Sequence, residues 1–269
     1  MGAFHACFAA PPPVGKVPAI NHHTVSEISA DLACSTRIPL AGTPYWRLTA
    51  KDFGLTRRER SVLRRTFHDS TEQDHWLPAG MTYRKRAYQL FELSVETMVF
   101  RPVADPPPYL QDTAVNPLAG GIERRFRVIA PDHPVTEPTR RIAATVARGL
   151  VAAGVLAADR TPKCLVDAHY MSITAPGSPA PEGKHRDGLI AGSAHLVERR
   201  NIKRDSGISA IYDGGNADRE LAGFELRRPL DSYVFDDERV LHYTTDICAA
   251  RPSYPAYRNV LLIGFRQRE

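Results

Sequence analysis

The pattern of apolar and polar positions divides the chain near residue 160 into two parts of different character. Before that point, apolar residues recur at helical spacing in TEPTRRIAATVARGLVAAG (136–154), and Gly154 is a suitable C-cap residue. A second helix is predicted after Thr56, because Thr56 and Glu59 have the spacing of a capping box.

Short strand-like pieces accompany these helices. YQLFELSV (88–95) and TMVFRPV (97–103) are rich in β-branched and aromatic residues, and IERRFRVIA (122–130) alternates between polar and apolar positions. Residues 1–50 are proline-rich and only weakly periodic, with one short helix predicted at TVSEISADLA (24–33). We interpret residues 1–50 as an N-terminal arm.

After residue 160 the pattern changes to short strands separated by Gly, Pro, Asn or Asp, with no helical segment between them. Such a series is typical of an antiparallel sandwich or barrel. We therefore predict a mainly β fold with supporting helices, in which residues 51–160 form an α+β half and residues 161–269 a jelly-roll core. A chain of 269 residues is long enough for a single domain of this kind. The predicted strands are CLVDAHYMSITA, IAGSAHLVERRNI, GISAIYD, AGFELRRPL, SYVFDD, RVLHYTTDI and YRNVLLIGF.

Composition argues against several classes of protein. The chain is 43% hydrophobic, but it has no run of about eighteen apolar residues, so no membrane span is expected. The N-terminus has no basic region ahead of its short apolar stretch, which argues against a signal peptide. Four cysteines without CxxC spacing argue against a structural zinc site and fit a reducing cytoplasm.

The formal net charge is +5, and much of the positive charge lies in TRRERSVLRR (56–65) and YRKR (83–86). The first group is best explained as the solvated face of the capped helix, since Val62 and Leu63 leave its arginines exposed. The sequence shows neither a recognition-helix pattern nor basic strands interleaved with aromatic residues, so no nucleic-acid partner is predicted. A modest positive field would favour small anionic substrates.

A group of potential metal ligands lies in PEGKHRDG (181–188). If this segment is extended, His185 and Asp187 point to the same face, while the basic residues beside them point away. His242 in RVLHYTTDI supplies a third ligand from a predicted strand. Two histidines and one carboxylate form the facial triad typical of non-haem Fe(II), which leaves adjacent positions open for a co-substrate and O2.

Each of these residues also has a purely structural explanation. His185 alone would fit a surface loop, His242 alone would fit a strand core, and an HxD triplet is common by chance. A histidine 55 residues after the triplet, on a jelly-roll strand, makes the iron site the better explanation. His169 lies in another predicted core strand and could line the pocket, but we do not predict it as a ligand.

YRNVLLIGF carries Arg258 in an otherwise apolar final strand. A buried arginine is costly unless it meets an anion, and its planar fork can hold a carboxylate bidentately. If the last strand lies beside the strand of His242, Arg258 would reach the far carboxylate of a dicarboxylate whose other end chelates the iron. The alternative is an edge-strand arginine that reaches solvent, which we consider the weaker explanation.

Four segments carry a resemblance to a known family: PEGKHRDG, RRNIKRDSGISAIYD, RPLDSYVFDDERVLHYTTDI and YRNVLLIGF. In order and spacing they resemble the bacterial Fe(II)/2-oxoglutarate-dependent dioxygenases that hydroxylate free L-amino acids, of which the isoleucine 4-hydroxylases are the best-known branch. With the upstream segment YLQDTAVNPLAGGIERRFRVI, the resemblance covers roughly residues 80–267.

This resemblance implies a double-stranded β-helix (cupin-like) core, with Fe(II) as cofactor, 2-oxoglutarate and O2 as co-substrates, and succinate and CO2 as co-products. It implies that His185, Asp187 and His242 are the iron ligands and catalytic residues, and that Arg258 binds the distal carboxylate of 2-oxoglutarate.

One segment departs from the family, because DSGISAIYD stands where relatives tend to have a Gly-Gly-Glu-Thr-like turn. We take this to favour an amino acid with a longer polar side chain, such as citrulline, arginine or lysine, in specialised metabolism. The alternative is an aliphatic amino acid such as isoleucine, leucine or methionine.

The substrate carboxylate requires a cation, and GGIERRF supplies Arg124 and Arg125, of which a strand can turn only one inward. We prefer Arg124 for this role, with Gln111 and Asn116 as polar contacts. Alternatively, these residues only shape a loop.

Two other classes of protein explain less of the sequence. A non-catalytic metabolite-binding jelly-roll would not need both the triad and Arg258, and a zinc hydrolase would leave Arg258 without a role. The sequence therefore predicts a cytoplasmic dioxygenase that acts on a free amino acid, and it carries no signal for an oligomeric state.

Overall fold

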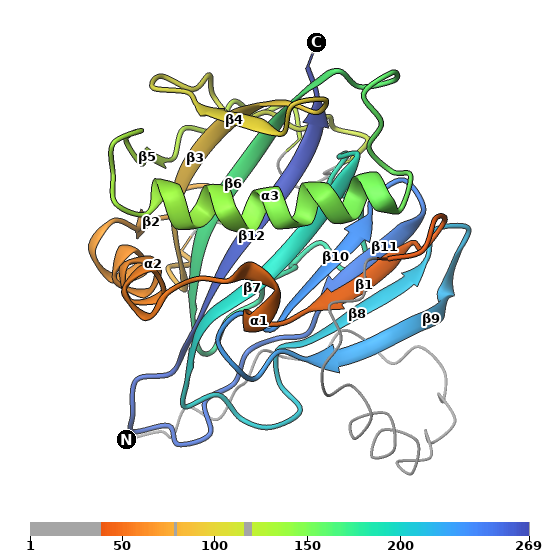
Figure 1. Ribbon diagram of the computed structural model, residues 1–269. Helices are drawn as coiled ribbons and strands as arrows, with labels where there is room; N and C mark the ends of the chain where they lie inside the picture. The colour runs from red at the N-terminus through yellow and green to blue at the C-terminus, as the bar shows by residue number, and fades with distance from the viewer. Residues whose placement is uncertain (1–38, 78–79, 116–119, 269) are drawn as a thin grey trace. The chain divides into compact units, whose positions relative to one another are not determined.

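The computed structural model describes residues 39–77, 80–115 and 120–268, which belong to one compact unit. This part of the chain contains three helices and twelve strands (Figure 1). The helices are α1 (Ala50–Phe53), α2 (Arg57–Asp69) and α3 (Thr136–Ala152). The strands are β1 (Tyr45–Leu48), β2 (Glu72–Gln73), β3 (Arg84–Ser94), β4 (Val99–Pro102), β5 (Arg127–Val128), β6 (Lys163–Thr174), β7 (Ala191–Arg200), β8 (Ile208–Asp213), β9 (Asn216–Glu225), β10 (Ser232–Asp236), β11 (Val240–Thr244) and β12 (Tyr257–Gln267).

The strands form two sheets. The large sheet has the order β1-β10-β7-β12-β6-β3-β2, with β4 and β5 also paired to β3, and the small sheet has the order β11-β8-β9. Among the described strands, only β3 and β5 pair in parallel. Leu196, Tyr233 and Val260 of the large sheet pack against Ile211 and Val240 of the small sheet. The fold is therefore mainly β with a jelly-roll core, as predicted.

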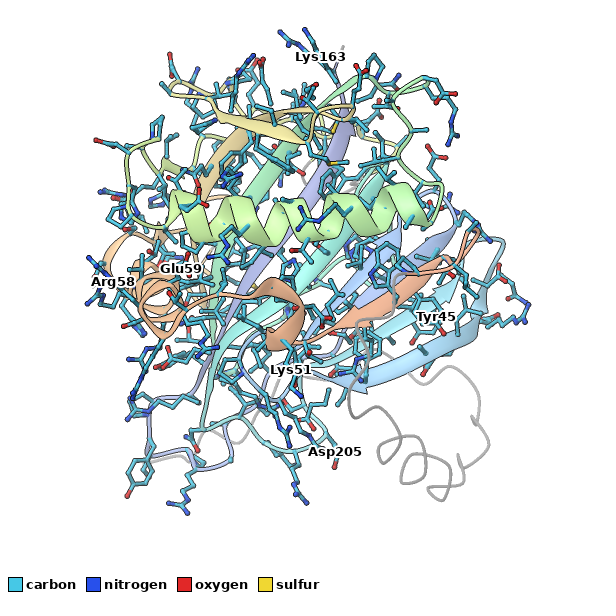
Figure 2. The ribbon with its side chains drawn as sticks, viewed as in Figure 1. Tyr45, Lys51, Arg58, Glu59, Lys163 and Asp205 are labelled. Atoms are coloured by element: carbon cyan, nitrogen blue, oxygen red, sulfur yellow. The ribbon has the colours of Figure 1, made fainter. Side chains whose placement is uncertain are left out.

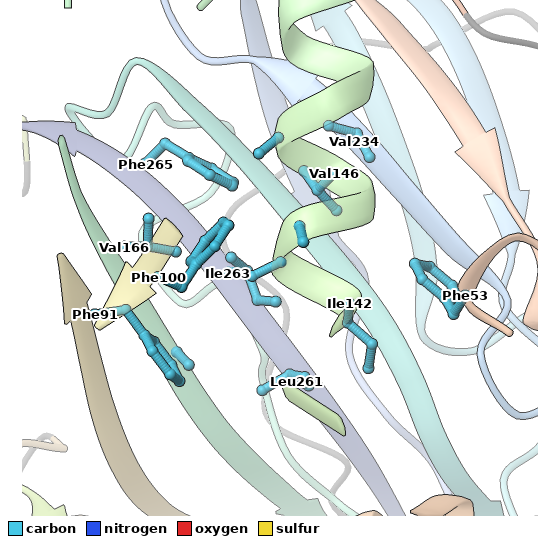
Figure 3. Close-up of a cluster of buried hydrophobic side chains, with 14 of the residues drawn as sticks. Phe53, Phe91, Phe100, Ile142, Val146, Val166, Val234, Leu261, Ile263 and Phe265 are labelled. Atoms are coloured by element: carbon cyan, nitrogen blue, oxygen red, sulfur yellow. The ribbon is translucent and has the colours of Figure 1, made fainter. Parts of the chain in front are cut away.

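Helix α3 covers the outer face of the large sheet (Figures 1 and 3). Its buried residues Ile142, Val146 and Leu150 recur every four positions along one side of the helix. They belong to the same core cluster as Leu261 and Phe265 of β12. Because truncating such a buried side chain to alanine costs about 2–5 kcal/mol, this contact holds the large sheet in place.

The opposite, inner face of the large sheet is the face turned to the small sheet, and it carries buried polar residues. Side chains alternate along a strand, so Arg258 points away from the α3 side to which Leu261 points. The same alternation places His169 of β6 and Arg86 of β3 on the inner face, with His169 opposite Tyr88. Charged residues are rarely buried without a partner, so this face marks the candidate site.

Two of the three helices that the sequence predicts are confirmed. Helix α2 follows the predicted capping box, in which Glu59 N donates to Thr56 Oγ1 and Thr56 N donates to Glu59 Oε2. Arg58 lies on its exposed side (Figure 2). Helix α3 ends at Ala152, and Gly154 follows with a φ of +76°, in the left-handed region that glycine adopts without strain.

Other segments differ from the sequence-based expectations. Residues 45–48 lie in the segment interpreted as an arm, but they form strand β1 at the edge of the large sheet, paired with β10. IERRFRVIA is a strand only at Arg127–Val128. In the charged group YRKR, for which no placement was predicted, Arg84 and Arg86 are buried and Lys85 is exposed. The helix predicted at residues 24–33 lies outside the described residues.

No helix among the described residues is both long enough and apolar enough to cross a membrane.

Candidate metal centre

The loop before β7 and strand β11 bring three metal-binding side chains together. His185 and His242 form a two-way backbone bridge, in which His185 N donates to His242 O at 3.1 Å and His242 N donates to His185 O at 2.9 Å. Asp187 lies next to both imidazoles, and one ligand atom from each of the three residues lies within 4.8 Å of the others. The structure thus assembles the predicted triad from residues 55 positions apart.

The backbone alternation around His185 is the one expected for an extended segment. Lys184 points away from the triad and donates to Ala217 O, and Arg186 points away and donates to Gly214 O. His185 and Asp187 are left on the shared side, where His185 Nε2 lies 3.7 Å from Asp187 Oδ1.

Hydrogen bonds and burial prepare both imidazoles for a metal. His185 Nδ1 lies 2.8 Å from Gly183 O, which fixes the proton on Nδ1 and leaves the Nε2 lone pair for a ligand. His242 Nε2 lies 3.5 Å from Asp187 Oδ2. Burial lowers the pKa of His242 to about 4, so the ring is neutral near pH 7. Two imidazoles and one carboxylate within 4.8 Å of one another fit the donor set of Fe(II).

Asp237 supports this triad, and the sequence analysis did not identify it. Its carboxylate accepts hydrogen bonds from the backbone N–H groups of Asp187 and Leu189, and Oδ1 lies 3.9 Å from His242 Nδ1. Burial and the negative charge of Asp187 raise the pKa of Asp237 to about 7. The sequence offered one signal for Asp237, which is its position two residues after Phe235. Phe235 faces inward, and its ring lies 4.4 Å from the ring of His242.

Arg258 lies on the inner face with only 4% of its surface exposed. Within the described residues its guanidinium makes no hydrogen bond or ion pair. Burial lowers its pKa to about 10, with Tyr233 as the main favourable neighbour. Ser209 Oγ lies 3.2 Å from Thr244 Oγ1, and both hydroxyl groups interact with the Tyr233 side chain. A buried cation beside three hydroxyl groups is suited to a carboxylate ligand.

One step of the sequence argument for Arg258 is wrong. Strand β12 does not lie beside β11, because it pairs with β6 and β7 in the large sheet, while β11 pairs with β8 in the small sheet. Arg258 and His242 therefore lie on strands of different sheets.

The predicted substrate contacts form a second polar group near the triad. Arg124 is buried and Arg125 is exposed, so Arg124 is the inward-facing arginine. Arg124 Nη2 donates to Gln111 Oε1 at 2.6 Å, and Gln111 Nε2 donates to Asp187 O at 3.0 Å. Asn116 lies outside the described residues.

Comparisons with known proteins agree with this arrangement. A family model described as 2OG-Fe dioxygenase matches residues 65–264, a range that includes the triad, Arg258 and Arg124. A search of curated protein sequences finds no match.

Solved structures of similar fold come from several sources. A bsmA homologue from Methylobium petroleophilum PM1 has a TM-score of 0.69 at 22% identity, over 83% of this chain and 89% of that one. IDO from Bacillus thuringiensis has a TM-score of 0.66 at 18% identity, over 84% and 92%. The Fe(II)/(alpha)ketoglutarate-dependent dioxygenase TqaL has a TM-score of 0.63 at 15% identity, over 84% and 83%.

Proposed function

Because the chain belongs to the 2OG-Fe dioxygenase family, whose enzymes use Fe(II), 2-oxoglutarate and O2, we propose that it hydroxylates an unactivated C–H bond of a free L-amino acid. One observation carries the proposal. Two separate buried arginines accompany the His–Asp–His triad: Arg124 is connected to Asp187 through Gln111, and Arg258 lies beside Tyr233, so a dicarboxylate and a further carboxylate can each be bound by a different cation.

His185, Asp187 and His242 would hold the iron. Bound Fe(II) couples the decarboxylation of 2-oxoglutarate, which yields succinate and CO2, to the transfer of one oxygen atom of O2 into a C–H bond. The residues around the triad hold its ligands in place. Phe235 packs against His242, and Asp237 fixes the backbone of Asp187.

Arg258 would bind the distal carboxylate of 2-oxoglutarate. Tyr233, Ser209 and Thr244 offer hydroxyl donors beside it, and the absence of a hydrogen-bonded anion among the described residues leaves the guanidinium available. The nearest acidic side chain, Glu225, instead pairs with Arg199 and Arg227.

Arg124 would bind the carboxylate of the amino acid, and Gln111 would hold Arg124 at a fixed place relative to Asp187. The departure DSGISAIYD lies largely in β8, which pairs with β11 and therefore borders the strand of His242. We favour a substrate with a longer polar side chain, such as citrulline, arginine or lysine, in specialised metabolism; isoleucine, leucine and methionine are the alternatives. The free thiols of Cys164 and Cys248 fit a cytoplasmic enzyme.

The proposal is tested with purified protein, Fe(II), ascorbate and 2-oxoglutarate against the free L-amino acids. At least one amino acid is expected to increase succinate formation and to gain one oxygen atom, in equal molar amounts. If no amino acid raises succinate above the substrate-free rate, the substrate class is wrong. If the chain binds amino acids but never forms succinate, it is a binding protein instead.

A further inference from the structure

The inner face carries two buried polar side chains, Arg86 and His169, that have no role in the site described so far. Both ring nitrogens of His169 are buried and make no hydrogen bond among the described residues. The rings of Tyr88, Tyr109 and Phe126 surround the imidazole at centroid distances of 4.9, 4.7 and 5.6 Å. A buried polar group without a partner destabilises the fold, so its presence here indicates a ligand.

Arg86 lies against the same aromatic rings. Its guanidinium carbon lies 4.7 Å from the centroid of Phe126, which contacts His169. Arg86 is only 8% exposed, and its Nε makes no hydrogen bond, although it lies 3.5 Å from Asp74 Oδ2. Burial, with the charge of Arg84, lowers the pKa of Arg86 to about 9, which still leaves it charged at neutral pH.

The charges in this region do not balance. Of the buried guanidinium groups of Arg84, Arg86 and Arg124, the first two pair with one carboxylate, Asp74, whose Oδ2 accepts from Arg84 Nε at 2.7 Å, and Arg124 has no ion pair among the described residues. Three cations and one anion leave an excess of two positive charges. Among the described residues, Arg124 donates only to the neutral amide of Gln111, and its Nε has no partner there.

Two other acidic side chains of the described residues lie near this group, and each already has another role. Asp187, whose charge acts on Arg124, is a proposed iron ligand. Asp167, two residues before His169 on β6, pairs with Arg266. His169 adds no positive charge, because burial and the charges of Arg86 and Arg124 lower its pKa well below the usual value. Buried cations in excess are stable only with an anionic ligand.

We propose that Arg86, Arg124 and His169 together bind the carboxylate of the substrate, and we call these three residues the carboxylate site. Two planar guanidinium forks match the oxygens of a carboxylate, and the neutral imidazole adds one N–H donor. This rests on the proposed function, in which the carboxylate belongs to a free amino acid. An amide or a peptide bond at the same place would leave the excess charge uncompensated, so the site selects free acids.

The first experiment does not assume an amino-acid substrate. Full-length protein is saturated with Fe(II) and 2-oxoglutarate without O2, which fills the place beside Arg258. Its melting temperature is then measured with acetate, inorganic phosphate or chloride at equal ionic strength. Acetate is expected to raise the melting temperature of the wild type but not of Arg86→Met. Lys85→Met is the matched control, because it removes the same charge from the adjacent, exposed position of β3 and should respond like the wild type.

Three results overturn the carboxylate site. They are no acetate response in the wild type, an equal response in Arg86→Met, and a response to phosphate alone. Arg86→Met itself is expected to fold, because Arg84 still pairs with Asp74 and a desolvated charge is removed. Without ligand its melting temperature should equal or exceed that of the wild type, whereas a residue present only for stability would lower it.

The second experiment measures binding by calorimetry under the same anaerobic conditions. The probes are L-citrulline, L-arginine, L-lysine and L-isoleucine, each with its carboxamide. For an amino acid that binds, amidation, Arg86→Met and His169→Phe are each expected to weaken binding about ten- to hundredfold. In Arg86→Met, amidation should have a much smaller further effect, since the same interaction is already lost.

The outcomes separate the carboxylate site from the proposed function. If no amino acid binds but acetate still acts only through Arg86, the substrate class fails and the carboxylate site stands. If an amino acid binds Arg86→Met as tightly as the wild type, the carboxylate site fails and the substrate class stands.

Discussion

Gln111 donates a hydrogen bond from its side-chain amide to the backbone carbonyl of Asp187, with an Nε2–O distance of 3.0 Å. The other end of the same amide accepts from Arg124 at 2.6 Å. One side chain thus connects a proposed iron ligand with a proposed substrate contact. With the iron at the triad and the substrate at Arg124, as proposed, this connection would fix the distance between the reacting carbon and the metal, on which the efficiency of such an enzyme depends.

Replacing Gln111 should therefore disturb coupling more than binding of 2-oxoglutarate. Gln111→Leu is expected to raise the amino-acid KM and to lower the yield of hydroxylated product per succinate, while the KM for 2-oxoglutarate stays near the wild-type value. Thr113→Ala, an exposed position on the same loop, serves as control. A variant with wild-type product per succinate would show that the connection has no functional role.

Arg258→Met tests the 2-oxoglutarate contact. The variant loses a buried charge-assisted interaction of several kcal/mol, so the KM for 2-oxoglutarate should rise on the order of a hundredfold or more. The amino-acid KM should change far less. Arg268→Met, which removes a half-exposed arginine near the chain end, should leave both constants unchanged. An unaltered KM for 2-oxoglutarate in Arg258→Met would contradict the assignment.

Asp237→Asn tests whether Asp237 holds the proposed iron ligands in place without being a ligand itself. The amide cannot accept at both ends, so the backbone N–H groups of Asp187 and Leu189 lose part of their anchor. Fe(II) affinity is expected to fall about ten- to hundredfold, as for other residues that orient metal ligands. The measurement is an anaerobic Fe(II) titration, with Asp218→Ala on the exposed part of β9 as control. Equal Fe(II) affinities of Asp237→Asn and the wild type would show that Asp237 does not support the ligands.

His195 gives a prediction on stability and pH. It is fully buried between Ser193 and Ser232, and burial lowers its pKa to about 3. Below about pH 6.5 the unfolded chain binds a proton at this residue and the folded chain does not, so stability falls as the pH falls toward 3. In urea unfolding, the wild type should lose up to about 1.4 kcal/mol per pH unit more than His195→Gln in this range. Parallel pH curves for the two proteins would refute the prediction.

The local parts of the site could be predicted from the sequence. His185 and Asp187 need only an extended backbone to share a face, and Arg258 is conspicuous in an apolar strand. The order of strands could not be predicted, because β12 pairs with β6 and β7 through contacts between residues far apart in the chain. Chain order alone does not determine such pairings.

Two residues of the proposed carboxylate site, Arg86 and His169, were not assigned to it for a related reason. YRKR received no placement from the sequence, yet β3 lies inside the large sheet and turns Arg84 and Arg86 to the inner face and Lys85 outward. The signal was the recurrence of arginine at every second position, with a lysine between. This spacing indicates a ligand site only when the strand pairing is known, because that pairing places His169 of β6 opposite Tyr88.

The measurement that tests the central claim most directly compares iron content and succinate formation in the wild type, Asp187→Ala and Asp218→Ala. Each protein is loaded anaerobically with Fe(II), freed of unbound metal, and then supplied with 2-oxoglutarate, O2 and the free amino acids. The account predicts stoichiometric iron and substrate-dependent succinate in the wild type and Asp218→Ala. It predicts little iron and no succinate in a folded Asp187→Ala. Wild-type iron and succinate in Asp187→Ala would contradict the account.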